Sequence, residues 1–310
     1  MGTPAGFLDS SISVERIAEA ARVIEPTFLN SPQFVCEPLG SNVLLKVETV
    51  NPIRSFKGRG TEYLLHRLDG AGDGLVCASA GNFGQGMAYA CRKRGVGLTV
   101  YASDAASALK IERMRALGAT VVLVPGDFDA AKDAARNHPG LFIEDGLLGA
   151  IAEGAGTIGI ELAAEALDAV FVPLGNGSLV NGVGTWLKHR SPQTRVVAVC
   201  AEGAPSMALS WKAHAAVTAP SDTIADGIAV RVPVPDAVRI METTVDDVML
   251  VSDGEMRDAM RSLFYEAGLL VEPAGAAGVA AIKKARPEGR VAAILTGGNL
   301  TEQQFRDWIY

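Results

Sequence analysis

Apolar and polar residues alternate along this chain with two different periods. From about residue 74, short runs rich in β-branched residues are each followed by a longer stretch with apolar residues at helical spacing. The first group predicts strands at 75–80, 97–103 and 120–126 and helices at 84–95, 108–119 and 129–138. A second group predicts strands at 169–175, 195–203 and 290–298 and helices at 178–190, 206–215 and 301–310.

Repeated strand and helix units with short glycine-rich joints favour an α/β fold, in which helices cover both faces of parallel sheets. No long linker separates the two groups, so any two lobes are expected to share an extended contact. Active sites in such folds lie at the carboxyl ends of the strands. Glycine-rich joints follow predicted strands at 79–82 (SAGN), 175–179 (GNGSL) and 296–299 (TGGN). We therefore expect the functional site at this edge.

Composition and charge narrow the class of function. The chain has 310 residues, of which 48% are apolar and 20% charged, and its formal net charge is −7 with Lys and Arg scattered. This pattern argues against a nucleic-acid or anionic-membrane partner. No uncharged apolar stretch has the length of a membrane span, and the first residues lack a basic segment followed by an apolar run. We expect a soluble, cytoplasmic protein that acts on a small molecule.

Cysteine and histidine residues give no sign of a metal site. The four cysteines show no CxxC spacing, and the four histidines lie far apart in the sequence. We predict reduced, mostly buried thiols and no bound metal.

One lysine stands in an unusual local sequence. Lys57 follows NPIRSF (51–56) and comes just before a predicted helix. A lysine at a helix entrance, beside an aromatic ring and glycines, can lie in a semi-buried pocket where its amine acts as a nucleophile. A solvated loop lysine explains the residue equally simply, so this stretch alone leaves both interpretations open.

The glycine-rich joints suit anions. Backbone amides at 79–82 can cradle a carboxylate or a phosphate, although a plain strand-to-helix turn also explains the glycine there. The amides of PLGNGSLVNG (173–182) could wrap a phosphate, but the spacing is not GxGxxG and there is no Walker lysine. A compact phosphate on a cofactor other than a nucleotide fits better. Thr296 ends a buried strand at the same edge, where its hydroxyl can also simply satisfy the local backbone.

Six segments, in order, resemble the motifs of one enzyme family. They are SFKGRG (55–60), ASAGNFGQG (78–86), LGNGSL (174–179), TIADGIAV (223–230), EPAGAAG (272–278) and LTGGN (295–299). Together they resemble the fold-type II pyridoxal phosphate enzymes, in particular the serine/threonine dehydratases. The resemblance implies the fold of the tryptophan synthase β chain, with two lobes, each a mostly parallel twisted sheet flanked by helices. It implies a large cofactor-binding domain at 1–73 and 146–310 and a small substrate-loop domain at 74–145.

The resemblance also implies roles for individual residues. Lys57 would form the internal Schiff base with pyridoxal 5'-phosphate, with Phe56 packed against the pyridine ring. The residues implied to bind the cofactor are Phe56, Lys57, Asn82, Gly175, Asn176, Gly177, Ser178, Leu179, Gly227, Glu272 and Thr296. Those implied to bind the substrate carboxylate are Ser79, Ala80, Gly81 and Asn82.

The implied activity is β-elimination. Serine, threonine or a related β-substituted amino acid would yield a 2-keto acid and ammonia, with Lys57 as the base that removes the α-proton. A hydroxyl from Thr296 at the pyridine nitrogen, in place of a carboxylate, favours elimination. Two alternatives stay open: a β-replacement or threonine-synthase-like enzyme, and a degenerate, non-catalytic small-molecule binding protein. Intact Lys57, Asn82 and Thr296 argue against the last.

Several positions depart from the family pattern. Ala80 stands where related racemases have a serine acid/base, so we expect no racemisation. Phe83 replaces a common histidine. Glu202 matches a cation ligand of some relatives, but Ala208 stands where its acidic partner is expected, which again predicts no tightly bound divalent metal.

Arg54 replaces a residue that is usually small or apolar. Its planar guanidinium could receive a second acidic group of the substrate, or it could lie on the surface, as most charged loop residues do. Which amino acid is the substrate is therefore open. We further expect a homodimer.

Overall fold

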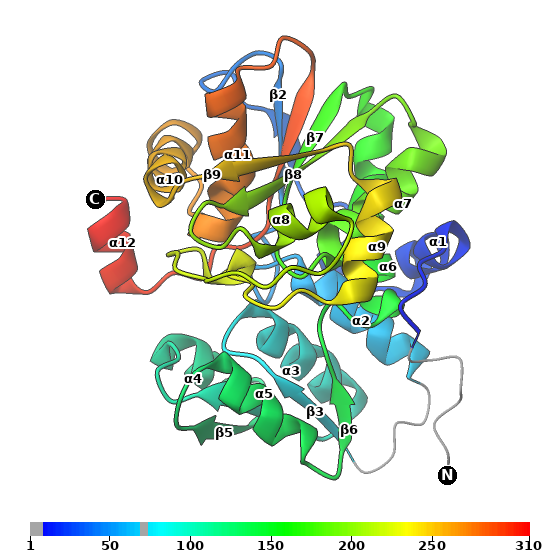
Figure 1. Ribbon diagram of the computed structural model, residues 1–310, viewed down its shortest axis with the longest axis vertical. Coiled ribbons are helices and arrows are strands. Elements are labelled where there is room, and N and C mark those ends of the chain that lie inside the picture. Colours follow the sequence, from blue (N-terminus) through cyan, green and yellow to red (C-terminus); the bar gives the residue numbers. More distant parts are fainter. Residues whose placement is uncertain (1–8, 69–73) are drawn as a thin grey trace.

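The computed structural model describes residues 9–68 and 74–310, which form two separate sheets (Figure 1). The larger sheet has the strand order β1-β2-β10-β7-β8-β9, and the smaller has the order β5-β4-β3-β6. Strands of the larger sheet are β1 (Gln33–Val35), β2 (Val43–Val47), β7 (Ala169–Pro173), β8 (Arg195–Ala201), β9 (Asp247–Val251) and β10 (Val291–Leu295). Those of the smaller sheet are β3 (Leu75–Ala78), β4 (Leu98–Ser103), β5 (Thr120–Val124) and β6 (Leu141–Ile143).

Neighbouring strands are parallel throughout both sheets except for the antiparallel pair β1 and β2. The helices of the chain lie around them: α1 (Val14–Val23), α2 (Lys57–Arg67), α3 (Asn82–Arg94), α4 (Ala108–Ala116), α5 (Phe128–Arg136), α6 (Gly149–Leu162), α7 (Ser178–Arg190), α8 (Ser206–Ala213), α9 (Pro235–Thr244), α10 (Asp253–Ala267), α11 (Pro273–Ala285) and α12 (Glu302–Trp308). Short 3₁₀ helices are η1 (Pro26–Phe28), η2 (Ala163–Glu165) and η3 (Asp226–Ile228).

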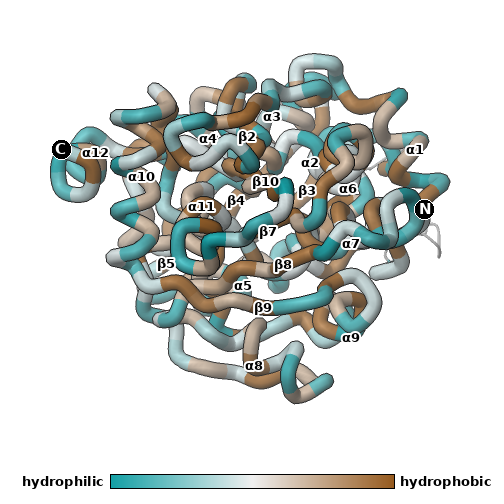
Figure 2. The backbone as a smooth tube through the Cα atoms, turned by 90° about the horizontal axis from the view of Figure 1, so that it is seen from above, coloured by the Kyte–Doolittle hydropathy of each residue, from teal (hydrophilic) through white to brown (hydrophobic). Residues whose placement is uncertain are grey.

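Helices bury both faces of the larger sheet. On β7, Phe171 faces a core shared with α10 and α11, whereas Val170 and Val172 face a second core shared with α6 and α7. This explains the continuous apolar run of β7, because a parallel strand covered on both sides needs no polar face. Figure 2 shows the same apolar character along β8. The predicted α/β fold with two mostly parallel, helix-flanked sheets is confirmed.

Two helices connect the sheets. In Figure 1, α2 and α6 lie between the upper and lower parts of the molecule, and α2 packs on both α3 and α6. The contact between α2 and α6 is close, since a Cβ on Gly154 would lie 2.4 Å from the carbonyl oxygen of Arg59. No helix in the described part of the chain is long and apolar enough to cross a membrane.

The smaller sheet runs from Leu75 to Ile143, within the predicted small domain at 74–145. The predicted boundary between residues 73 and 74 lies beside 69–73, which are outside the described residues. The division of the chain into these two domains therefore stays a prediction. Below, "small lobe" means the part that contains β3 to β6, and "large lobe" the part that contains the larger sheet.

Candidate active site

A cavity of about 550 Å³ lies between the carboxyl ends of strands from both sheets. Its wall includes Ala78, Ile143 and Pro173, the last residues of β3, β6 and β7. Most residues predicted to bind cofactor or substrate also line it: Phe56, Lys57, Ser79, Ala80, Gly81, Asn82, Gly175, Asn176, Gly177, Leu179, Gly227, Glu272 and Thr296. The structure thus gathers residues from six separate segments at the sheet edge that the sequence indicated.

Lys57 is the first residue of α2 and points into this cavity. The turn before it is anchored to the end of β10, because the amide of Phe56 donates to the Thr296 carbonyl at 3.0 Å and Ser55 Oγ donates to the same oxygen at 3.1 Å. Lys57 Nζ lies 4.8 Å from the centre of the Phe56 ring and 5.9 Å from that of Phe83. Its amine therefore sits between aromatic faces rather than in a solvated loop.

Asp145 pairs with this lysine, and the sequence analysis did not find it. Its Oδ2 lies 2.5 Å from Lys57 Nζ, and its Oδ1 accepts a hydrogen bond from Ser178 Oγ at 3.1 Å. The neighbouring Gly146 has φ +90° and packs on Asn176, so the loop that carries Asp145 is fixed against the turn after β7. The available signal was its position two residues after β6, at the same carboxyl edge as the other site residues.

A buried polar network spans the two lobes. Asn82 Nδ2 donates to Glu272 Oε1 at 2.5 Å, and Asn299 Nδ2 donates to Asn82 Oδ1 at 2.8 Å. The amide of Asn299 donates to Glu272 Oε2 at 3.2 Å. Arg113 of α4 also donates to Asn299 Oδ1. Asn82 begins α3 in the small lobe, whereas Glu272 and Asn299 belong to the large lobe, so the network fixes one lobe against the other at the cavity. Asn299 was part of the predicted LTGGN segment but was given no role.

Glu272 is almost fully buried, with 2% of its surface exposed. Burial raises the pKa of its carboxyl to about 7; the Lys110 ammonium opposes this rise and the Asp226 carboxylate adds to it. The carboxyl therefore keeps its proton to a higher pH than an exposed glutamate does.

The turn between β3 and α3 forms the predicted carboxylate site. Ser79 Oγ accepts the amides of Gly81 at 3.2 Å and Gly84 at 2.9 Å, so this hydroxyl shapes the turn. Gly84 permits the close packing of α4, because a Cβ there would lie 2.4 Å from Met114 Sδ. The first amides of α3 have no acceptor within the helix and can bind an anion. Below, "carboxylate turn" means residues 79–82.

The turn between β7 and α7 forms the predicted phosphate site, and "phosphate turn" below means residues 175–179. Gly177 has φ +101°, a left-handed conformation that favours glycine. Gly175 lies so close to Gly227 that a Cβ would be 2.6 Å from its carbonyl oxygen. Asn176 Oδ1 accepts the amide of Ser178 at 3.2 Å. The first amides of α7 have no acceptor within the helix, so this turn can bind a phosphate through its backbone.

Three other predicted residues lie in different settings. Arg54 is exposed and is not part of the cavity wall; it has φ +51°, and its carbonyl accepts the amide of Gly298 at 3.0 Å. Its position gives no support to a substrate-binding role. Phe83 is buried and lines the cavity. Glu202 pairs with Lys284 at 3.3 Å, and the described residues hold no group of three or more His, Cys, Asp and Glu suited to a metal.

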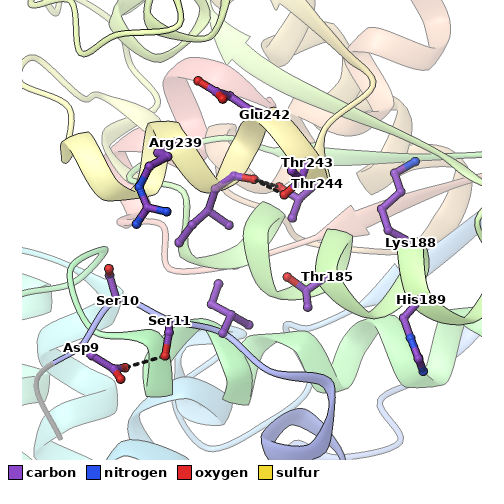
Figure 3. A pocket seen from close by; sticks show the side chains of 12 residues that line it. Asp9, Ser10, Ser11, Thr185, Lys188, His189, Arg239, Glu242, Thr243 and Thr244 are labelled. Carbon is purple, nitrogen blue, oxygen red and sulfur yellow. Dashed lines mark hydrogen bonds between the residues drawn. The ribbon is translucent and has the colours of Figure 1, made fainter. Parts of the chain in front are cut away.

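A second cavity, of about 740 Å³, lies where the chain before α1 meets α7 and α9 (Figure 3). Its labelled side chains include Asp9, Ser11 and Thr185, and Lys188 at its margin pairs with Asp246 at 2.5 Å. None of the predicted site residues lines it. Although this cavity is larger, the chemistry of the side chains assigns the active site to the first one.

Comparison with known proteins agrees with this geometry. The model of a family described as "Pyridoxal-phosphate dependent enzyme" matches residues 21–297. The chain belongs to this family. Within the family, it is 34% identical to the L-threonine ammonia-lyase of Thermotoga maritima, over 93% of this chain and 76% of that protein. The solved structure of maize serine racemase superposes with a TM-score of 0.88 at 25% identity, covering 96% of both chains. The processed form of threonine deaminase isoform 2 from Solanum lycopersicum has a TM-score of 0.86 at 26% identity, covering 99% of this chain and 97% of that one.

These likenesses confirm the predicted fold-type II family, the pyridoxal phosphate cofactor and the lyase class. The site fits the cofactor on its own evidence as well. The phosphate turn leads into α7, whose first backbone amides can bind a phosphate, and Lys57 supplies an amine between two aromatic rings.

Proposed function

We propose that this family member is an ammonia lyase that converts serine, threonine or a related β-substituted amino acid into a 2-keto acid and ammonia. The observation that supports it best is the meeting of Lys57, the carboxylate turn and the phosphate turn at one cavity. The relatives named as threonine dehydratases and ammonia-lyases support the same reaction class.

Different residues of the cavity would bind different parts of the cofactor and the substrate. Lys57 would hold the cofactor covalently, and the phosphate turn, Ser178 included, would bind its phosphate. Thr296 and Glu272, which line the same cavity, would face its ring. When bound, the cofactor supplies the electron sink that makes the α-proton of an amino acid acidic. The carboxylate turn would orient that amino acid through its carboxylate.

Proton transfer is assigned to Lys57. Its Nζ is a basic atom of the cavity wall, and Asp145 at 2.5 Å is placed to stabilise the ammonium that forms when Nζ takes a proton. Only 14% of the Lys57 side chain and 16% of that of Asp145 are exposed, so this pair exchanges little with bulk water. We also propose a cytoplasmic homodimer as the working form.

The Lys57→Ala variant tests this assignment. We expect it to fold but to lose the visible absorption of the Schiff base and to lose turnover by about a thousandfold or more, since covalent attachment and proton transfer both require this amine. Lys93→Ala, which removes a surface lysine paired with Glu25, should retain both. Normal turnover by Lys57→Ala would remove Lys57 from its role.

A further inference from the structure

Lys110 on α4 is a buried cation at the cavity that the predicted site does not include. Only 4% of its surface is exposed, and it lines the cavity. Its Nζ pairs with Asp226 Oδ2 of η3, which belongs to the large lobe. The sequence predicted a helix over this position but gave no reason to place its ammonium at a site.

The ammonium of Lys110 lies directly beside the carboxylate turn. A Cβ built on Gly81 would have Lys110 Nζ, at 4.0 Å, as its nearest neighbour. The packing of Met114 against Gly84 holds α4 in this position. A ligand carboxylate on the amides of 79–82 would therefore lie within reach of a full positive charge.

The other cations of the cavity wall are paired elsewhere. Lys57 pairs with Asp145, Lys132 with Glu144, and Arg231 with Asp129. Of the cationic side chains in the described part of the cavity wall, Lys110 is the one whose ammonium lies next to the carboxylate turn.

The two partners in the pair of Lys110 and Asp226 differ in their access to water. The Asp226 side chain is 59% exposed, whereas that of Lys110 is 6% exposed. Burial lowers the pKa of the Lys110 ammonium, but the charges of Asp226 and Glu272 outweigh this effect and leave the pKa above its usual value. Lys110 is therefore held charged, and Asp226 can move into water at small cost while a second carboxylate takes its place.

We propose that Lys110 binds the α-carboxylate of the amino-acid substrate together with the carboxylate turn, and that Asp226 competes with the substrate for it. Asp226 would keep the buried ammonium paired until an amino acid enters. This inference rests on the proposed function for the nature of the ligand, an amino acid, but not for the elimination step.

Alanine is the suitable probe because it has the α-carboxylate but no β-substituent that can leave. Its dissociation constant for the holoenzyme can be measured from the change that it causes in the visible spectrum. We expect Lys110→Met to weaken alanine binding about ten- to a hundredfold, as for the loss of a partly shielded charge-assisted contact. Asp226→Asn should tighten binding, by about three- to tenfold, because the competing charge is gone.

Lys188→Met serves as the matched control. It also removes a partly buried, ion-paired lysine, but one that lies outside this cavity, and it should leave alanine binding unchanged. Equal dissociation constants for wild type and Lys110→Met would overturn the proposal. So would weaker binding by Asp226→Asn, since that result would mean that the pair only holds the lobes together. Asp226→Asn tests whether Asp226 competes with the substrate carboxylate for Lys110 even if Lys110→Met does not fold.

The test also separates this proposal from the proposed function. If alanine binding depends on Lys110 but no β-hydroxy amino acid yields a keto acid, the lyase assignment fails and the carboxylate site stands. If keto acid forms but alanine binding does not depend on Lys110, the lyase assignment stands and the carboxylate site at Lys110 fails. Absence of alanine binding by the wild-type holoenzyme would overturn the carboxylate site.

Discussion

At the scale of single residues, Ala80 decides what the carboxylate turn cannot do. It lines the cavity next to Ser79 but carries no group that can give or take a proton. The hydroxyl of Ser79 is already engaged by two backbone amides. At position 80 the turn therefore has no proton donor, and we expect no racemisation.

Replacing Ala80 by serine should supply that donor. We expect Ala80→Ser to gain exchange of the α-proton or racemisation of serine or alanine in heavy water, which proton NMR and chiral chromatography detect. Ala78→Ser places a hydroxyl elsewhere in the cavity wall and is the control. If neither exchange nor racemisation appears, the two-base argument for this position is wrong.

Glu272 gives a prediction about pH. Its pKa in the folded chain, about 7, lies above the ordinary value of 4.5. The folded chain therefore binds this proton more tightly than the unfolded chain, and the stability that it contributes is present below about pH 4.5 and is lost as the pH rises through 7. Between pH 5 and 8, we expect the unfolding free energy of wild type to fall more than that of Glu272→Gln. The difference between the two falls should be about 1 to 3 kcal/mol.

Urea denaturation of the holoenzyme across this pH range measures the difference. Glu302→Gln, which changes an exposed acid paired with Arg306, should follow the wild-type curve. Parallel curves for Glu272→Gln and wild type would show that the carboxyl titrates in its ordinary range.

The site residues that were predicted from the sequence share one property: the neighbouring sequence is enough to locate them in the fold. Lys57 follows a turn that leads into a helix, and the two anion turns follow strands, so each could be assigned to the carboxyl edge. Asp145 and Lys110 act through contacts with residues 88 and 116 positions away. Their roles depend on how the two lobes meet, which no local pattern contains.

At the scale of elements, the start of α2 is set by a glycine. A Cβ on Gly58 would lie 2.1 Å from the ring of Phe28, which is buried and cannot yield. Gly58→Ala should therefore displace the first turn of α2, and Lys57 with it, and lower the unfolding free energy by about 1 to 3 kcal/mol.

Gly254→Ala is a closely matched control for this variant. Gly254 is also the second residue of a helix, α10, but a Cβ there meets its nearest atom at 3.7 Å. Urea denaturation and the fraction of chains that carry the Schiff base measure both effects. Equal stability of the two variants would contradict the packing argument.

Strong apolar periodicity allowed several elements to be predicted closely. The helix expected at 178–190 has those bounds as α7, and the strand expected at 75–80 is observed as β3. The strands that the pattern did not indicate have weak signals for physical reasons. β1 and β6 have three residues each, β9 begins at Asp247 on the sheet edge, and β2 contains Lys46, which is buried against Glu161.

At the scale of the whole molecule, the active site exists only because two sheets present their carboxyl edges to one cavity. The order of the motifs along the chain was enough to predict the fold class and which segments contribute. The network of Asn82, Glu272 and Asn299, and the pair of Lys110 and Asp226, were not predictable, because each joins side chains from different lobes.

The central claim is that these parts together eliminate the β-substituent of an amino acid. It is tested most directly by supplying the holoenzyme with serine, threonine, 3-hydroxyaspartate and alanine and measuring ammonia and 2-keto acid in the same reaction. Including 3-hydroxyaspartate also shows whether an acidic substrate is preferred, as a substrate-binding Arg54 would require. We predict equal amounts of ammonia and keto acid from at least one β-hydroxy amino acid and none from alanine. Failure of every β-hydroxy amino acid to yield both products, with the cofactor fully bound, would contradict the account.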